Sequence, residues 1–166
     1  MRVLVSAASK HGATAEIADR IGATLRDRGF VVTVESPDRV EALDEYGAVV
    51  LGSGVYAGHW MKDAKYLTDR VAACDPVPPV WLFSSGPLGD PPKPDEEPVD
   101  VAKIVEVVPP VEHRIFAGKI DKNELGFGER AIMVAVRAAD GDFRDWDAIE
   151  SWANDIADTL TPTDDA

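Results

Sequence analysis

The fold of this chain is decided near its start, by the stretch Val3-Leu4-Val5-Ser6-Ala7-Ala8-Ser9-Lys10-His11-Gly12-Ala13-Thr14. Its first three residues are aliphatic and predict a short buried strand. Small residues end that strand, and a glycine turns the chain. From residue 14 to residue 25, apolar residues recur three and four positions apart, which predicts an amphipathic helix. The stretch therefore predicts a strand that passes through a small-residue turn directly into a helix.

The same alternation continues through the rest of the chain. Further strands are predicted at residues 30–34, 47–52, 80–83 and 113–117, and further helices at 60–71, 100–108 and 145–160. Trp60 is expected on the apolar face of the second helix, together with Ala64, Leu67 and Val71. Residues 87–98 contain five prolines and are expected to form an irregular exposed loop. Residues 124–138 fit a strand or a helix, and we favour the helix.

Five short strands separated by helices require right-handed crossovers, and therefore a parallel sheet with helices on both faces. The common order for five such strands is 2-1-3-4-5, the doubly wound arrangement called flavodoxin-like. Ligands of these α/β sheets bind at the carboxyl ends of the strands, where the winding reverses. We therefore expect the loops after strands one, three and four to meet. Residues 1–160 are expected to form a single domain, followed by a flexible acidic tail at 161–166.

Composition excludes several classes of function. The 166 residues include 17 basic and 30 acidic side chains, which gives a formal net charge of −13. This charge disfavours binding to nucleic acid or to an anionic membrane. Cys74 is the only cysteine, so neither an internal disulfide nor a cysteine-based zinc site is expected, and no metal site is predicted. No secretory signal or membrane-spanning run is visible, which predicts a cytoplasmic protein whose oligomeric state is open.

The first loop has the features of a phosphate-binding turn. Its backbone N–H groups are expected to point inward, and the start of the following helix favours negative charge. Hydroxyl groups can add hydrogen bonds, and a lysine and a histidine can add positive charge. The spacing matches neither the dinucleotide motif G-x-G-x-x-G nor the nucleotide motif G-x-x-x-x-G-K-[ST]. The predicted phosphate-binding residues are Ser9, Lys10, His11, Gly12, Ala13 and Thr14.

The other two loops suit a flat ligand. After the third strand, Gly54 and Gly58 flank Tyr56, so that backbone and ring can approach a planar molecule. Tyr56 can instead pack on a neighbouring loop. After the fourth strand, small residues can bring backbone amides near the polar edge of a ring. The predicted contact residues are Val55, Tyr56, Ala57 and Gly58 in one loop, and Ser85, Gly86, Pro87 and Leu88 in the other.

From residue 2 to about residue 160, the chain resembles the flavodoxin superfamily. The flavodoxin signature is matched at Ser9, Gly12, Thr14, Ala18 and Ile21, although Ala7 stands where flavodoxins usually carry an aromatic residue. Within the superfamily, the chain looks most like the branch that contains menaquinone-dependent protoporphyrinogen oxidase. The segments that carry this resemblance are 9–14, 49–59, 116–118 and 145–146.

The resemblance implies that FMN is the cofactor and that the three loops hold it. It further implies an FMN-dependent oxidoreductase that removes hydrogens from a tetrapyrrole precursor and passes the electrons to quinone. One segment departs from this branch, whose members carry a basic and aromatic insertion before the last helix. Here the matching residues 119–143 have mixed charge and include Asp140-Gly141-Asp142. No catalytic residue is assigned.

Two other interpretations stay open. The first is a soluble flavodoxin-type electron carrier without a substrate of its own, whose acidic faces steer it towards basic redox partner proteins. The second is a module that has the flavodoxin fold without a cofactor. A response-regulator receiver domain is excluded, because that class needs an acidic cluster after strand one and Ser6-Ala7-Ala8 provides none.

Overall fold

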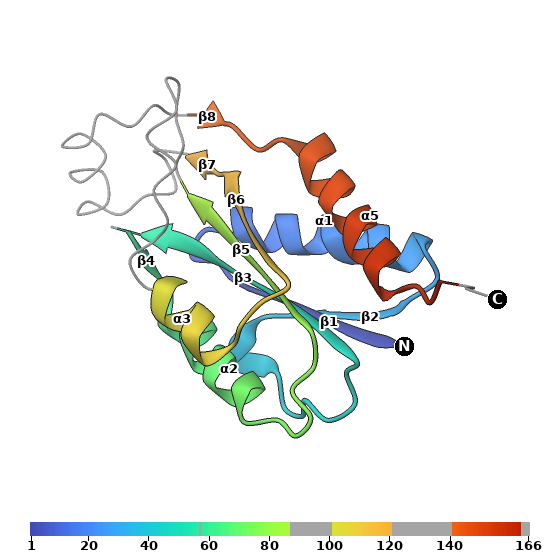
Figure 1. Ribbon diagram of the computed structural model, residues 1–166. Helices are drawn as coiled ribbons and strands as arrows, with labels where there is room; N and C mark the ends of the chain where they lie inside the picture. The colour runs from blue at the N-terminus through green and yellow to red at the C-terminus, as the bar shows by residue number, and fades with distance from the viewer. Residues whose placement is uncertain (57, 87–100, 121–140, 164–166) are drawn as a thin grey trace.

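The computed structural model describes residues 1–56, 58–86, 101–120 and 141–163 (Figure 1). Its main strands and helices follow the alternation that the sequence predicts. In chain order the elements are β1 (Arg2–Ala8), α1 (Ala13–Asp27), β2 (Val31–Glu35), the short 3-10 helix η1 (Pro37–Arg39), β3 (Ala48–Tyr56), β4 (His59–Trp60), α2 (Lys62–Ala72), β5 (Val80–Gly86), α3 (Val101–Val107), β6 (Glu112–Ala117), β7 (Lys119–Ile120), β8 (Gly141–Asp142) and α5 (Trp146–Leu160).

The long strands form a parallel sheet in the order β2-β1-β3-β5-β6. The two-residue strand β4 pairs antiparallel with the end of β3 and lies off this path. When only the long strands are counted, the order is 2-1-3-4-5. Figure 1 shows α1 and α5 on one face of the sheet and α2 and α3 on the other. The predicted flavodoxin-like doubly wound fold, with helices on both faces, is therefore confirmed.

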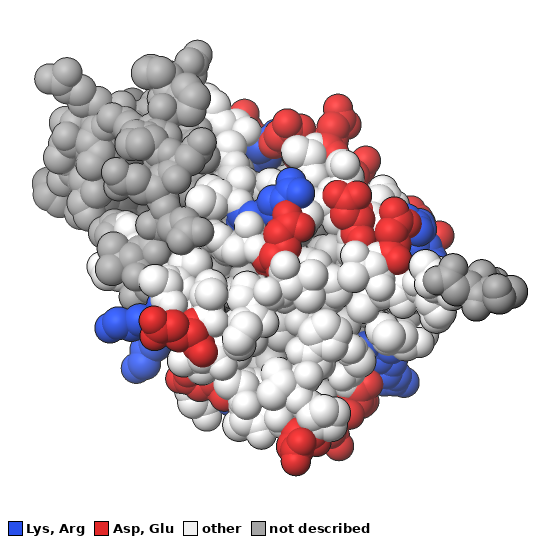
Figure 2. All heavy atoms as spheres, in the orientation of Figure 1, with Lys and Arg blue, Asp and Glu red and all other residues white. Residues whose placement is uncertain are grey.

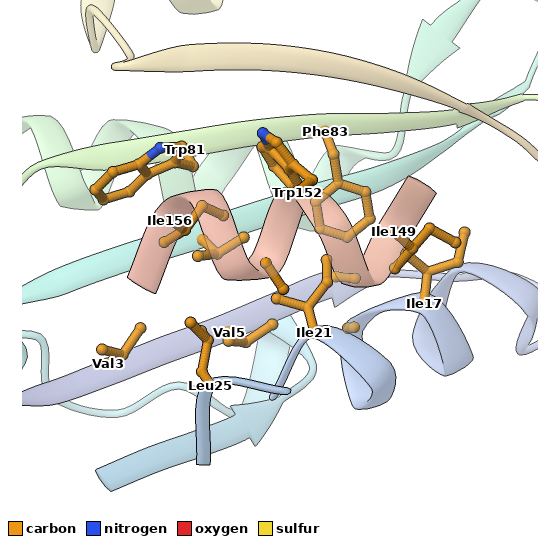
Figure 3. Close-up of a cluster of buried hydrophobic side chains, with 14 of the residues drawn as sticks. Val3, Val5, Ile17, Ile21, Leu25, Trp81, Phe83, Ile149, Trp152 and Ile156 are labelled. Carbon is orange, nitrogen blue, oxygen red and sulfur yellow. The ribbon is translucent and has the colours of Figure 1, made fainter. Parts of the chain in front are cut away.

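Among the described residues, buried apolar side chains form one cluster on each face of the sheet. Alternation along the strands assigns them, since Val5 and Phe83 face α1 and α5, whereas Leu4 and Leu82 face α2 and α3. Strands of a parallel sheet are buried on both faces, which explains the nearly continuous apolar runs in the sequence. Figure 3 shows side chains of α1, α5 and the sheet pointing towards one another in the first cluster.

The last helix begins where the sequence predicts. Asp145 is its N-cap residue, and a carboxylate oxygen (Oδ1) accepts a hydrogen bond from the Ala148 N–H at 3.0 Å. The helix packs against α1, and Arg20 forms an ion pair with Glu150 at 2.5 Å across this contact. Both side chains are partly exposed, so the apolar contacts between the helices contribute most of the stability there.

One predicted element differs from the structure. Trp60 lies in β4, before α2 begins at Lys62, and not on the face of a helix. Its side chain is nevertheless buried in the cluster that α2 covers. A tight turn with Gly58 in a left-handed conformation (φ +80°) folds the chain back, so Trp60 pairs with Val55 of β3. The helical spacing of Trp60 with Ala64 reflected burial on the same face, rather than a shared helix.

Two other predictions lie outside the described residues, namely the proline-rich loop at 87–98 and the helix favoured for 124–138. In the parts of the chain that the structure describes, no helix is long and apolar enough to cross a membrane. Within the same residues, no three His, Cys, Asp or Glu side chains lie close enough together to hold a metal ion.

Candidate functional site

The carboxyl ends of β1, β3 and β5 lie side by side and consist of small residues. Ala8 pairs with Ser53, and Gly54 pairs with Ser85, and these three strands continue three to four residues beyond their predicted ends. Apart from Val55 and Tyr56 at the end of β3, these positions are serine, alanine and glycine, which allows neighbouring backbones to come close. The register therefore places the beginnings of the three predicted loops at one edge of the sheet.

The first loop is shaped by a local hydrogen bond. The Ser9 hydroxyl oxygen accepts from the Gly12 N–H at 3.0 Å, and Gly12 has a left-handed conformation with φ +88°. Gly12 is also the N-cap residue of α1, and no side chain among the described residues caps the first turn. The first N–H groups of a helix have no partner within the helix. This turn therefore presents unsatisfied donors and the positive end of a helix dipole.

Thr14 adds a hydroxyl group to this turn. The residue is only 4% exposed. Its hydroxyl has no hydrogen-bond partner within the described part of the chain. This hydroxyl is therefore available as a donor, and an acceptor that binds at the start of α1 would accept its hydrogen bond.

The second loop reaches the first through Tyr56. The Lys10 N–H donates a hydrogen bond to the Tyr56 hydroxyl oxygen at 3.3 Å, and the Lys10 ammonium lies 5.7 Å from the centre of the ring. Of the two arrangements that the sequence left open for Tyr56, the structure has the ring packed on the first loop. Burial raises the pKa of the Tyr56 hydroxyl, although the Lys10 N–H acts in the opposite direction, so this phenol is protonated at neutral pH.

The third loop begins at Ser85 and Gly86, beside the second. A Cβ atom placed on Gly86 would lie 3.7 Å from the Val55 Cβ. Gly118, the residue after β6, packs directly against Gly86. A Cβ atom on Gly118 would lie only 2.7 Å from the Gly86 carbonyl oxygen. Gly118 therefore sets how near β6 comes to the start of this loop.

At the same edge, polar side chains on the face of the sheet covered by α2 form hydrogen bonds with one another. The Trp60 indole N–H donates to the Ser84 hydroxyl at 2.8 Å, and that hydroxyl also lies 2.9 Å from Nε2 of His113. The Ser53 hydroxyl accepts from the Met61 N–H at 2.9 Å and donates to the Gly54 carbonyl oxygen at 2.8 Å. These bonds join β3, β4, β5 and β6 below the loops, so the edge is held rigidly.

Arg144 was not expected from the sequence. Its side chain is 5% exposed, and its guanidinium donates to the Ala13 carbonyl oxygen at 3.3 Å and forms ion pairs with Glu16 and Asp142. It also lies 4.6 Å from the Trp146 ring. The hydrogen bond to Asp142 raises the pKa of Arg144, and in return lowers that of Asp142. Arg144 thus ties the segment before α5 to the first turn of α1, and no motif or spacing in the sequence pointed to it.

The structure places the predicted site residues as follows. Ser9 to Gly12 lie between β1 and α1, and Ala13 and Thr14 lie in the first turn of α1. Val55 and Tyr56 lie at the end of β3, Gly58 in the following turn, and Ser85 and Gly86 at the end of β5. Lys10, Thr14 and Tyr56 come together around Gly54, and Val55 lies beside Gly86. Ala57, Pro87 and Leu88 lie outside the described residues.

Acidic side chains dominate the charge of the molecular surface. On the face shown in Figure 2, they gather over the region where Figure 1 places α1 and α5, interleaved with basic ones. This distribution agrees with the net charge of −13. In contrast, Lys10 and His11 in the first loop are basic residues with no acidic neighbour within three positions along the chain.

Comparisons with known proteins agree with this architecture. A flavodoxin from the domain Archaea is 19% identical, with a TM-score of 0.65 over 96% of this chain and 98% of that chain. A flavodoxin from Streptococcus pneumoniae TIGR4 is 16% identical, with a TM-score of 0.65 over 96% of this chain and all (100%) of that chain. The rubredoxin oxygen:oxidoreductase of Desulfovibrio gigas is 15% identical, with a TM-score of 0.64 over 96% of this chain but 36% of that chain.

These identities are low, so the structural neighbours show the fold. No curated protein matches the sequence. The family model of the flavodoxin domain, however, matches residues 4–147, which include all three loops of the site. The chain therefore belongs to the flavodoxin domain family.

Proposed function

We propose that this protein binds FMN at the carboxyl edge of its sheet and serves as an electron carrier of the flavodoxin type. FMN is the cofactor of flavodoxin domain proteins. The observation that carries the proposal is the meeting of three small-residue loops beside an uncapped helix start and the unpartnered Thr14 hydroxyl. A phosphate ester attached to a flat ring system would satisfy both parts of this site.

The residues present fit FMN. The first turn of α1 offers N–H donors and a helix dipole to the phosphate, and a Cβ on Gly12 would meet nothing within 4 Å, so that side of the turn is open. Ser9 holds the turn through its bond to Gly12. Val55, Gly58, Ser85 and Gly86 supply backbone and small side chains for the ring. Ala57, Pro87 and Leu88 are proposed as further ring contacts from the sequence.

When bound, FMN supplies reversible uptake and release of electrons. The chain's own residues orient the ring, exclude water from its inner face and provide backbone hydrogen bonds to its polar edge. The network of Ser84, Trp60 and His113 keeps these loop ends in place during electron transfer. Such a role needs no residue that reacts covalently with a substrate.

A first prediction tests the phosphate side of the site. We expect Thr14→Val to weaken FMN binding by roughly tenfold to a hundredfold, because a lost hydrogen bond to a charged group costs about 1.5–3 kcal/mol. Riboflavin, which lacks the phosphate, should bind equally well to the variant and to the wild-type protein. Titration monitored by quenching of flavin fluorescence measures both affinities. Thr24→Val is the matched control, since the Thr24 hydroxyl bonds to the Arg20 carbonyl on the exposed side of the same helix.

Equal losses for FMN and riboflavin would contradict the role of Thr14 at the phosphate. A wild-type protein that binds neither flavin would instead support the module without a cofactor. Ser9→Ala provides a second variant at this turn, and it should also weaken FMN more than riboflavin, because the Ser9 hydroxyl holds the turn closed at Gly12.

A second prediction separates the carrier from an oxidoreductase that acts on protoporphyrinogen, the activity that the resemblance at residues 49–59 implies. For a carrier with a net charge of −13, electron transfer from the dithionite-reduced protein to a basic acceptor such as ferric cytochrome c should be fast at low salt. The rate should fall several-fold between about 0.01 M and about 0.15 M ionic strength, because screening shortens the Debye length. Stopped-flow absorbance of the cytochrome measures this rate.

The same FMN-loaded protein should not accelerate the oxidation of protoporphyrinogen by a soluble quinone beyond a flavin-free control. Oxidation well above that control would favour the oxidoreductase and its quinone acceptor. A salt-independent rate with cytochrome c would contradict steering by the acidic surface.

A further inference from the structure

We propose that the hydroxyl group of Tyr56 binds the phosphate of the cofactor, and that the Tyr56 ring is not a wall for the flavin. This inference rests on the proposed function, and it assigns a residue of the second loop to the phosphate side of the site. The expectation for a tyrosine between two glycines at this edge would be stacking against a flat ring. Three observations favour the phosphate instead.

The first observation is the direction of the ring. A Cβ placed on Gly54 would lie 3.0 Å from Cε2 of Tyr56, 3.2 Å from its hydroxyl oxygen and 3.2 Å from the Thr14 hydroxyl oxygen. Residues 54 and 56 point to the same face of β3, towards α1. The phenol therefore folds back over Gly54, which has no side chain to prevent it, and its hydroxyl reaches the neighbourhood of Thr14.

The second observation is the hydrogen bonding of this hydroxyl. Its oxygen accepts from the Lys10 N–H at 3.3 Å, which belongs to the phosphate-binding turn. Within the described part of the chain, the hydroxyl hydrogen has no acceptor. A phenol is both donor and acceptor, so the bond to Lys10 leaves its O–H available. Burial favours the protonated phenol, and the group therefore remains a donor at neutral pH.

The third observation is what surrounds the hydroxyl. Beside it lie the Thr14 hydroxyl, which has no hydrogen-bond partner within the described part of the chain, and the uncapped first turn of α1. Two hydroxyl donors and the backbone N–H groups of one helix start form a donor set that matches a phosphate dianion, which has only acceptor oxygens. The ring itself lies against position 54, and the Lys10 ammonium lies 5.7 Å from its centre, so the ring is already in contact with the protein on the phosphate side.

The deciding experiment compares Tyr56→Phe with the wild-type protein. Phenylalanine keeps the ring and any stacking, and it removes the hydroxyl alone. We expect the affinity for FMN to fall roughly tenfold, and the affinity for riboflavin to change less than about twofold. The matched control is Tyr66→Phe, because Tyr66 lies on α2 and is 65% exposed. This control should bind both flavins as the wild-type protein does.

Each outcome decides between the alternatives. If Tyr56→Phe binds FMN with unchanged or higher affinity, or loses FMN and riboflavin equally, the phosphate role of Tyr56 is wrong while the proposed function stands. If the wild-type protein binds no FMN, the proposed function itself fails. Thermal unfolding of each variant shows whether it is folded at the temperature of the titration.

A second variant reaches the same hydroxyl by a different route. Gly54→Ala introduces a methyl group at the position where the Tyr56 and Thr14 oxygens meet, so both must move by a few tenths of an ångström. We expect this variant also to lose FMN affinity while retaining riboflavin. In the double variant with Tyr56→Phe, the loss should be less than the product of the two single losses, because both act on one group. Multiplicative losses would overturn the proposal.

Discussion

Gly52→Val is expected to destabilise the protein by about 3 kcal/mol. Gly52 lies in the middle of the sheet, on the face covered by α1 and α5, directly opposite the Phe83 ring. A Cβ atom there would lie 2.2 Å from Cζ of Phe83 and 2.4 Å from its Cε1 and Cε2 atoms. Phe83 cannot yield easily, because its ring is fully buried between Phe116 and Trp152, with ring centres 6.2 Å and 6.0 Å away. Urea unfolding monitored by far-UV circular dichroism measures the loss.

The matched control for this variant is Gly86→Ala on the adjacent strand. Its new Cβ would have an ordinary contact of 3.7 Å with Val55, so the free energy of unfolding should change by less than about 0.5 kcal/mol. If Gly52→Val unfolded at the same urea concentration as the wild-type protein, the Phe83 ring would have to be free to move. The close packing of the Phe83 ring on Gly52 would then be wrong.

Trp152→Ala is expected to have an effect at least as large, about 3–5 kcal/mol. The indole is 1% exposed on α5 and makes edge-to-face contacts with Phe83 and Phe116, whose ring centres are 6.0 Å and 5.5 Å away (Figure 3). Alanine would leave a cavity among side chains from two strands and two helices. These neighbours are anchored in the sheet, so they cannot collapse to fill the cavity.

Trp152→Phe provides the informative comparison. The Trp152 indole nitrogen is buried and has no hydrogen-bond partner among the described residues. Phenylalanine removes this unsatisfied donor and keeps most of the aromatic contact, so we expect a loss of about 1 kcal/mol. Thermal and urea unfolding measure both variants. A loss as large for phenylalanine as for alanine would show that the indole N–H is satisfied after all.

The sheet order and the main helices were predictable from the sequence, because they follow from periodicity and topology. Val3 to Val5 and Val49 to Leu51 are unbroken apolar runs, as expected for strands with both faces buried. The helical stripe of Ile17, Ile21 and Leu25 marks the face of α1 that packs on the sheet. Once strands and helices alternate, the handedness of the crossovers leaves few possible arrangements.

The ends of the strands were not predictable in the same way. Ala8, Ser53 and Ser85 all pair within the sheet, although serine and alanine are poor strand formers. Their pairing is imposed by the neighbouring backbones and is not a local preference. The apolar spacing of Trp60 likewise predicted correctly that its side chain is buried, but it predicted the wrong secondary structure. A hairpin at Gly58 brings the indole into the cluster that α2 covers.

For the candidate site, the sequence predicted which loops would meet, and the structure confirms that they begin at one edge. It left open how Tyr56 lies, since a single aromatic residue between glycines fits stacking and packing equally well. The role of Arg144 could not be predicted, because its partners, Glu16 and the Ala13 carbonyl, are 128 and 131 positions away in the sequence. A contact between residues so far apart produces no local pattern, such as helical or strand periodicity, in a single sequence.

The packing of α5 on α1 has a consequence for the order of events during synthesis. A ribosome releases the phosphate-binding turn and α1 early, yet Ile149, Trp152 and Ile156, which cover that helix, emerge more than a hundred residues later. Until then the part of α1 that packs on α5 has no cover, although the strands released earlier can cover the rest of its apolar side. We therefore expect the nascent chain to form a complete cofactor site only after α5 has been released. A flavin added to stalled chains that end before residue 145 should find no site.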